Sequence, residues 1–248
     1  MTIPAEWIIP AWPAPKNVRA LITTRAGGVS EGGYASMNLG AYVNDAEKSV
    51  AENRAILRKH IPAEPKWLRQ VHGTRVVNAD NVIEAPEADA SIARQPHSVC
   101  VIAIADCVPI LFCDAPGSVV AAAHAGWRGL RAGVIENTVR EMNCASAELM
   151  AYLGPAIGPQ NFEVGDEVRQ AFVQQGADAS AAFKPKPEGK WLADIYLLVR
   201  QRLHAVGVTQ IYGGGFCTVA EARFFSHRRD KVSGRMAALI WLEKSDSE

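Results

Sequence analysis

Three short apolar runs in the middle of the chain limit the folds that it can adopt. They span residues 99–104, 108–112 and 119–123. Each run is long enough for a strand and too short to cross a bilayer as a helix. Continuous apolar runs of this length are typical of strands buried on both faces of a sheet. We therefore expect buried sheet strands at the centre of the molecule. The first two strands are separated by the short segment Ala105-Asp106-Cys107.

Further strands and helices surround these runs. We expect strands over residues 18–25, 67–79, 149–153, 210–212 and 236–242, and helices over residues 45–61, 130–142, 166–174 and 194–206. Asn44 or Asp45 can cap the first helix. Residues 184–190, rich in lysine and proline, are expected to form a mobile surface loop. No internal repeat interrupts this alternation, so we expect a single α+β domain over residues 1–248.

Charge and cysteine content exclude several classes of partner and compartment. Basic and acidic residues balance at 26 each, which gives no reason to expect a nucleic acid, a membrane surface or an obligate protein partner. The five cysteines are odd in number and form no CxxC pair, which indicates thiols in a reducing compartment. The N-terminus has no basic segment followed by an apolar one. We therefore expect a cytoplasmic protein.

His72, Cys107 and His124 are candidate ligands of a soft metal. His72 ends a strand segment that breaks at Gly73-Thr74, Cys107 interrupts two apolar runs, and His124 ends a strand before Ala125-Gly126. A rigid scaffold can present side chains to a loop at such strand ends. Zinc accepts imidazole and thiolate together, and three protein ligands leave a fourth position open for catalysis. The separations of 35 and 17 residues match no compact metal motif. Spacing alone therefore favours a buried thiol and two hydrogen-bonded histidines.

Ordered motifs along nearly the whole chain resemble those of the YfiH/laccase-domain family. The three that carry the candidate ligands are Gln70-Val-His-Gly73, Ala105-Asp-Cys-Val-Pro-Ile-Leu111 and His124-Ala-Gly-Trp-Arg-Gly129. The others are Thr24-Arg-Ala-Gly-Gly-Val-Ser30, Ser36-Met-Asn-Leu-Gly40, Gly154-Pro-Ala-Ile-Gly158 and Ser226-His-Arg-Arg-Asp230. One departure is His227, where the family more often has an aromatic residue. Members are described as polyphenol oxidases, purine nucleoside phosphorylases and peptidoglycan editing factors.

This resemblance implies a fold, a metal centre and an activity. The fold would be mixed β-sheets sandwiched between helices. Zn²⁺ would be bound by His72, Cys107 and His124, which would form the catalytic centre. The partners would be a nucleoside and phosphate. The implied reactions are phosphorolysis of adenosine, inosine, guanosine and methylthioadenosine, and hydrolytic deamination of adenosine.

The residues near these motifs suit both reactions. Deamination needs a hydroxide at neutral pH, which zinc can supply, and a proton relay for which Asp106 is a candidate. The sequence is equally compatible with Asp106 as a capping or turn residue. Phosphorolysis needs a phosphate site, and the candidate residues are Arg25, Arg128, Arg228 and Arg229, with Arg235 beside them. Asn38 can hold a ribose hydroxyl or occupy a left-handed turn. Trp127 can stack on a base, although we expect it in the core.

Three other functions use the same residues. Cys107 with a histidine base can act as a nucleophilic hydrolase, which would fit the editing of cytoplasmic peptidoglycan precursors. A multicopper oxidase needs many paired histidines, but the chain has six histidines and no HxH pair, so copper is expected only as an adventitious occupant. A structural zinc site in a binding protein would need a fourth ligand, for which His97 and His227 are the candidates.

Overall fold

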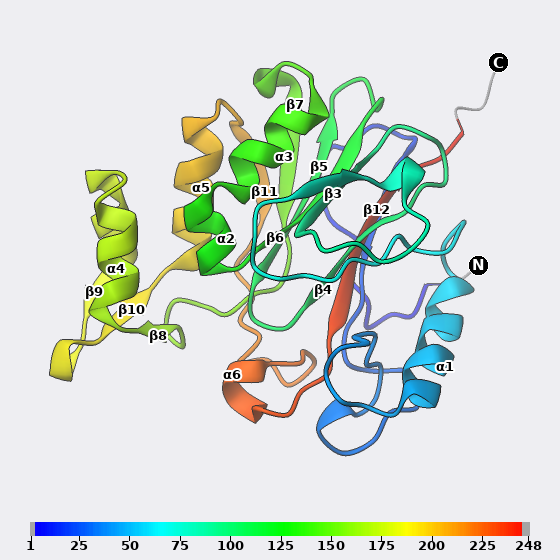
Figure 1. Cartoon of the computed structure of the whole chain (residues 1–248), viewed down its shortest axis with the longest axis horizontal. Coiled ribbons are helices and arrows are strands. Elements are labelled where there is room, and N and C mark those ends of the chain that lie inside the picture. The colour runs from blue at the N-terminus through cyan, green and yellow to red at the C-terminus, as the bar shows by residue number, and fades with distance from the viewer. Residues whose placement is uncertain (1–2, 245–248) are drawn as a thin grey trace.

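The computed structural model describes residues 3–244 as an α+β fold with two packed β-sheets at its centre (Figure 1). The larger sheet has the order β11-β7-β5-β6-β3-β2 and is mixed, because its two outer pairs are parallel and its inner pairs antiparallel. Its strands are β2 (Val76–Asn78), β3 (Ala90–Ala93), β5 (Val108–Asp114), β6 (Val120–Ala125), β7 (Leu149–Leu153) and β11 (Gln210–Gly213). The smaller, antiparallel sheet has the order β1-β12-β4, with strands β1 (Val18–Ile22), β4 (Cys100–Ile104) and β12 (Met236–Leu242).

Helices cover the outer face of each sheet. The helices are α1 (Glu47–Arg58), α2 (Trp127–Ala132), α3 (Val134–Met142), α4 (Asp166–Val173), α5 (Ile195–Ala205) and α6 (His227–Asp230). Short 3₁₀ turns span Gly32–Tyr34, Ala79–Asn81, Ser146–Glu148, Ala177–Ala182 and Pro187–Gly189. In Figure 1, α2, α3 and α5 lie on one side of the sheets and α1 lies on the other. No helix among residues 3–244 combines the length and apolar character needed to cross a membrane.

Alternating side chains of the central strands build the layers. In β5, Ile110 and Phe112 pack toward α3 and α5, while Leu111 and Cys113 pack toward the smaller sheet. Strand β12 alternates in the same way between the larger sheet and the layer formed by α1. All seven residues of β5 are buried, as the apolar run predicts for a strand covered on both faces. The expected arrangement of mixed sheets between helices is confirmed.

Several boundaries differ from the expectations. The helix expected over residues 130–142 is two helices, because Gly133 takes a left-handed φ of 105° between α2 and α3. Of residues 67–79, only Val76–Asn78 form a strand, since the backbone N–H groups of residues 71–73 bind a side chain instead of a neighbouring strand. The first helix has Ala46 at its N-cap, with no side-chain cap.

A third, small sheet accounts for the lysine- and proline-rich segment. Its order is β8-β10-β9, with strands β8 (Glu163–Val164), β9 (Phe183–Pro185) and β10 (Trp191–Ala193). It projects with α4 from one side of the molecule (Figure 1). Residues 184–190, expected as a loop, therefore comprise the end of β9 and the turn into the paired strand β10.

The connection from β4 to β5 is the feature of the fold that matters most for the site. Strand β4 belongs to the smaller sheet and β5 to the larger one, so residues 105–107 cross from one sheet to the other. Asp106 makes this crossing with a left-handed φ of 82°. The crossing places Cys107 at the open end of the two sheets.

Candidate functional site

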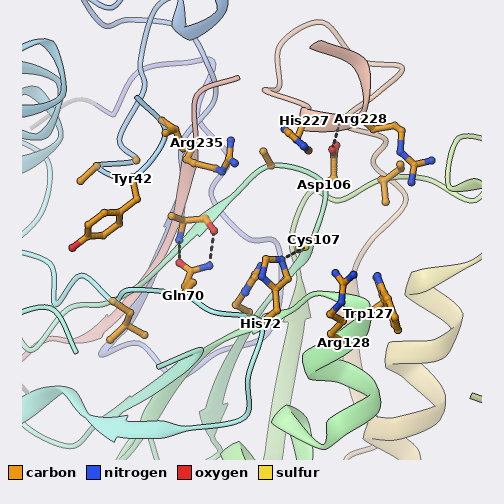
Figure 2. A pocket seen from close by; sticks show the side chains of 18 of the residues that line it. Tyr42, Gln70, His72, Asp106, Cys107, Trp127, Arg128, His227, Arg228 and Arg235 are labelled. Atoms are coloured by element: carbon orange, nitrogen blue, oxygen red, sulfur yellow. Dashed lines mark hydrogen bonds between the residues drawn. The ribbon is translucent and has the colours of Figure 1, made fainter. Parts of the chain in front are cut away.

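His72, Cys107 and His124 meet at this end of the sheets. Their ligand atoms all lie within 4.8 Å of one another, and His72 Nε2 lies 3.8 Å from Cys107 Sγ. His72 comes from the loop before β2, Cys107 from the β4–β5 crossing and His124 from β6. Figure 2 shows the His72 side chain directed at Cys107. The three candidate ligands, separated by 35 and 17 residues in the chain, therefore form one group.

Asp89 connects two of these candidate ligands, and no local sequence pattern predicted this role. Its buried carboxylate accepts a hydrogen bond from His124 Nδ1 at 2.8 Å and from the backbone N–H of His72 at 2.9 Å. The N–H groups of Val71 and Gly73 donate to the other carboxylate oxygen. A carboxylate on Nδ1 fixes the imidazole orientation and leaves Nε2 free to bind a metal. Asp89 is therefore a positioning residue of this centre.

Gln70 and Asp106 hold the loops that carry His72 and Cys107. Gln70 makes two hydrogen bonds with the backbone of Ala103 in β4, at 2.9 and 2.7 Å (Figure 2). The Asp106 carboxylate accepts hydrogen bonds from Thr218 Oγ1 at 2.6 Å and from the backbone N–H of Arg228 at 2.7 Å. Both oxygens of Asp106 are therefore engaged in fixing the crossing and α6, in keeping with a turn residue.

The cysteines differ in their electrostatic surroundings. Burial alone would raise the pKa of the Cys107 thiol, but His124 and His72 outweigh burial and hold this pKa below its ordinary value. Burial raises the pKa of Cys100 and of Cys113 to about 12. The thiolate is the form that ligates metals and attacks carbonyl groups. Cys107 is therefore chemically distinct from the two core cysteines.

The group fits a metal ion with one open position. A tetrahedral zinc ion would set its nitrogen and sulfur ligands about 3.3–3.6 Å apart, and the His72 Nε2–Cys107 Sγ distance of 3.8 Å is close to this range. Among the described residues, no fourth histidine, cysteine, aspartate or glutamate joins the group. His227 lines the same cavity without belonging to the group, and the backbone N–H of His97 bonds to Leu242 at the end of β12. Three ligands with a fourth position open match the pattern of catalytic zinc sites, whereas structural zinc sites have four protein ligands.

Because Gly126 has no side chain, His72 and Cys107 can pack against its backbone. A Cβ atom built on it would lie 2.7 Å from His72 Cδ2 and 2.9 Å from Cys107 Sγ. We expect Gly126→Ala to displace one ligand and to weaken zinc binding by about 10- to 100-fold, the range found when the support of a metal ligand is lost. Competition with a chromogenic chelator measures this. Gly176→Ala is the matched control, since no atom lies within 4 Å of its added Cβ. Unchanged zinc affinity in Gly126→Ala would contradict the assignment of the ligands.

A cavity of about 600 Å³ opens above the three residues. Trp127, Ile157, Phe162 and Ile195 supply apolar surface on its wall. The cations that line it are Arg54, Arg128, Arg228, Lys231 and Arg235, and Asp106 is the carboxylate among its described lining residues. The cavity is therefore positively charged around an apolar wall, which suits a ligand that combines a flat ring with an anion.

Of the five residues expected to bind substrate, two line the cavity and three do not. Arg128 and Arg228 line the cavity, and so does Trp127, which was expected in the core (Figure 2). Arg25 lies elsewhere, with Nε on the carbonyl of Ala35 and its guanidinium over Phe225.

Arg229 and Asn38 also have internal roles. Arg229 pairs with Asp230 and donates to three backbone carbonyls, those of Thr218, Val219 and Phe224. Asn38 is fully buried. Sequence patterns cannot separate such roles from ligand binding, because both use the same polar side chains.

Comparison with known proteins identifies the family of this chain. Residues 19–243 match the model of a family described as multi-copper polyphenol oxidoreductase laccase. The chain belongs to this laccase-domain family. A laccase-domain relative from Pseudomonas aeruginosa, named purine nucleoside phosphorylase, is 53% identical over 239 residues and covers 96% of this chain and 98% of its own length. The Escherichia coli protein named purine nucleoside phosphorylase YfiH is 53% identical over 242 residues, at 96% and 99% coverage.

Solved structures of the laccase-domain family share the fold. A crystal structure from Neisseria meningitidis superposes with a TM-score of 0.94 at 48% identity and covers 96% of this chain and all of its own. The structure of YlmD from Geobacillus stearothermophilus superposes with a TM-score of 0.90 at 30% identity, covering 98% of each chain. The family description names copper, whereas the described residues of this chain form one three-ligand group. That group lacks the further ligands that a multicopper cluster requires.

Proposed function

We propose that this protein is a zinc-dependent purine nucleoside phosphorylase that also deaminates adenosine. The observation that carries the proposal is the open His72–Cys107–His124 group at the floor of a cationic cavity with an apolar wall. The names of the Pseudomonas and Escherichia relatives support the phosphorylase activity. The proposed partners are a purine nucleoside and inorganic phosphate.

The chain's own residues would bind and orient both substrates. Trp127 and Phe162 offer the purine ring a surface for stacking, and the cavity's cations attract the phosphate dianion. In phosphorolysis a phosphate oxygen bonds to C1′ of the ribose. The glycosidic bond breaks with its electron pair moving to the purine, which takes up a proton, and ribose 1-phosphate is released. Bringing the two reactants together in one cavity lowers the entropic part of the barrier.

A metal bound by His72, Cys107 and His124 would supply Lewis-acid stabilisation and, for deamination, a hydroxide at neutral pH. Asp89 would hold His124 in the tautomer with Nε2 free, and Gln70 would keep the His72 loop against β4. The apolar wall recognises the ring more than its substituents. This supports acceptance of adenosine, inosine, guanosine and methylthioadenosine alike. We also propose a cytoplasmic location, since the five cysteines are free thiols.

One arrangement favours a second candidate function. Cys107 lies beside His72 and His124, and His124 Nδ1 is bonded to Asp89, an order of groups that also occurs in cysteine hydrolases. Without a metal, these residues could hydrolyse an amide of a cytoplasmic peptidoglycan precursor. The two candidates differ in their need for zinc, because a metal-bound thiolate is not a free nucleophile.

Removal of the metal distinguishes these candidates. We expect dialysis against a chelator to abolish phosphorolysis of adenosine, and zinc to restore it linearly up to one ion per chain, because all three ligands serve one ion. Cu²⁺ at the same stoichiometry is expected to occupy the site without restoring that activity. Amide hydrolysis that persists in the chelated protein, with no phosphorolysis in the reconstituted one, would contradict the zinc phosphorylase and support the hydrolase.

A further inference from the structure

Arg235 differs from the other arginines of the cavity because, within residues 3–244, it packs on no aromatic ring, and it also keeps unused donors. It directly precedes β12, and its guanidinium points into the cavity toward the loop that carries Asp106 and Cys107 (Figure 2). Nη1 donates to the carbonyls of Ser233 at 2.8 Å and Gly234 at 3.0 Å. Within residues 3–244, Nε and Nη2 have no acceptor and no carboxylate forms an ion pair with this guanidinium.

Burial makes this unpaired charge costly. Desolvation lowers the pKa of Arg235 from its ordinary value, although Cys107 and Asp106 act in the opposite direction. Both oxygens of Asp106 already accept hydrogen bonds from other groups. A partly buried guanidinium without a partner is stabilised when an anion enters beside it. The cavity therefore has a place for an anion next to the metal group.

A buried polar network holds Arg235 in this position. Asn38 Oδ1 accepts the backbone N–H of Arg235 at 2.8 Å and that of Gly40 at 2.9 Å. Asn53, fully buried on α1, donates to the carbonyl of Asn38 at 2.9 Å, and Asn38 Nδ2 donates to Asp45 at 2.9 Å. The network fixes the backbone from which the guanidinium extends, and such preorganisation reduces the entropic cost of binding.

Gly40 completes this support. A Cβ atom on Gly40 would lie 2.7 Å from Cγ of Arg235, so the stem of the arginine packs where a side chain would otherwise be. Asn38, expected as a ribose ligand, instead positions Arg235 through its backbone. The segment 36–40 therefore contributes to the cavity indirectly.

The other arginines of the cavity pack on aromatic rings. Arg228 donates to the carbonyl of Glu163 and lies over Phe162. Arg54 donates twice to the carbonyl of Leu39 and stacks 3.9 Å over Trp67. Arg128 is exposed and lies 4.5 Å over Trp127, on the apolar wall. Arg235 combines free donors with a fixed position.

We propose that Arg235 binds the attacking inorganic phosphate through Nε and Nη2, while the nucleoside base occupies the wall of Trp127 and Phe162. This inference rests on the proposed function, since it assigns the phosphate position for that reaction. The two free donors lie on one edge of the guanidinium, which matches two phosphate oxygens. The network around Asn38 and Gly40 is the scaffold of this subsite.

The test uses zinc-loaded protein and two independent readouts. Calorimetric titration with inorganic phosphate measures binding without turnover, and steady-state kinetics give the KM for phosphate and for adenosine. We expect Arg235→Gln to raise the phosphate Kd and KM about 30- to 300-fold, because two charge-assisted hydrogen bonds are lost, and to change the adenosine KM less than about 3-fold. Arg19→Gln, which removes an exposed arginine paired with Glu243, is the matched control.

Gly40→Ala tests the same subsite without removing a charge. The added methyl group should displace the arginine stem and raise the phosphate Kd about 5- to 20-fold, within the loss of one such hydrogen bond. Phosphate binding equal to that of the wild type in both variants would overturn the inference while leaving phosphorolysis intact. Arg235-dependent phosphate binding in a protein that turns over no nucleoside would instead support the subsite and refute the proposed function.

Discussion

Cys107→Ala is expected to reduce phosphorolysis at least about 10³-fold, because it removes the thiolate ligand and with it several kcal/mol of Lewis-acid stabilisation. The thiolate is the anionic member of the three-ligand group. Loss of one of three ligands leaves two imidazoles, which bind zinc far more weakly. Zinc content measured after gel filtration should fall in parallel with the rate of adenine release.

Cys144→Ala is the matched control for this variant. Cys144 is a partly exposed free thiol after α3, and burial raises its pKa. The control should keep its zinc and its activity. Phosphorolysis near the wild-type rate in Cys107→Ala would contradict the assignment of the centre, whatever the zinc content of the variant.

Asp89→Asn is expected to weaken zinc binding about 10- to 100-fold and to destabilise the fold, although Asp89 touches no metal. The carboxylate accepts four hydrogen bonds, two on each oxygen. An amide keeps one acceptor oxygen and places an NH₂ group against two N–H donors on the other side. Either His124 or the loop of His72 then loses its support. Chelator competition measures the affinity, and urea unfolding measures a loss of about 1–3 kcal/mol for each donor left unpaired.

Asp114→Asn is the control that separates loss of stability from loss of zinc affinity in Asp89→Asn. Asp114 is equally buried, and its carboxylate accepts hydrogen bonds from Ser118 and Val119 in a turn away from the cavity. Its amide variant should lose stability while keeping the wild-type zinc affinity. If Asp89→Asn likewise lost only stability, Asp89 would be a structural residue and not a positioning residue of the centre.

The strands at the centre of the fold could be read from local sequence. The apolar runs at 99–104, 108–112 and 119–123 correspond to β4, β5 and β6, because burial on both faces requires apolar side chains at every position. Local sequence could not show that β4 and β5 belong to different sheets. That partition depends on the pairing of β4 with β12, more than a hundred residues later in the chain.

The His72–Cys107–His124 group was predicted from ordered motifs, since the spacing of these three residues in the chain follows no local rule. Asp89 escaped notice because its partners lie 16 to 35 residues away and only the fold brings them to its carboxylate. The arginines show the same limit. Arg25 and Arg235 look alike in sequence, yet Arg25 donates to a backbone carbonyl outside the cavity and Arg235 keeps two donors free inside it.

The products formed from adenosine test the central claim most directly. Zinc-loaded protein is incubated with adenosine, with and without inorganic phosphate, and the products are separated by chromatography. We expect adenine and ribose 1-phosphate in equal amounts, formed only when phosphate is present, together with some phosphate-independent inosine. Failure to release a base from any purine nucleoside in the presence of phosphate, with one zinc bound per chain, would contradict the assignment of this protein as a nucleoside phosphorylase.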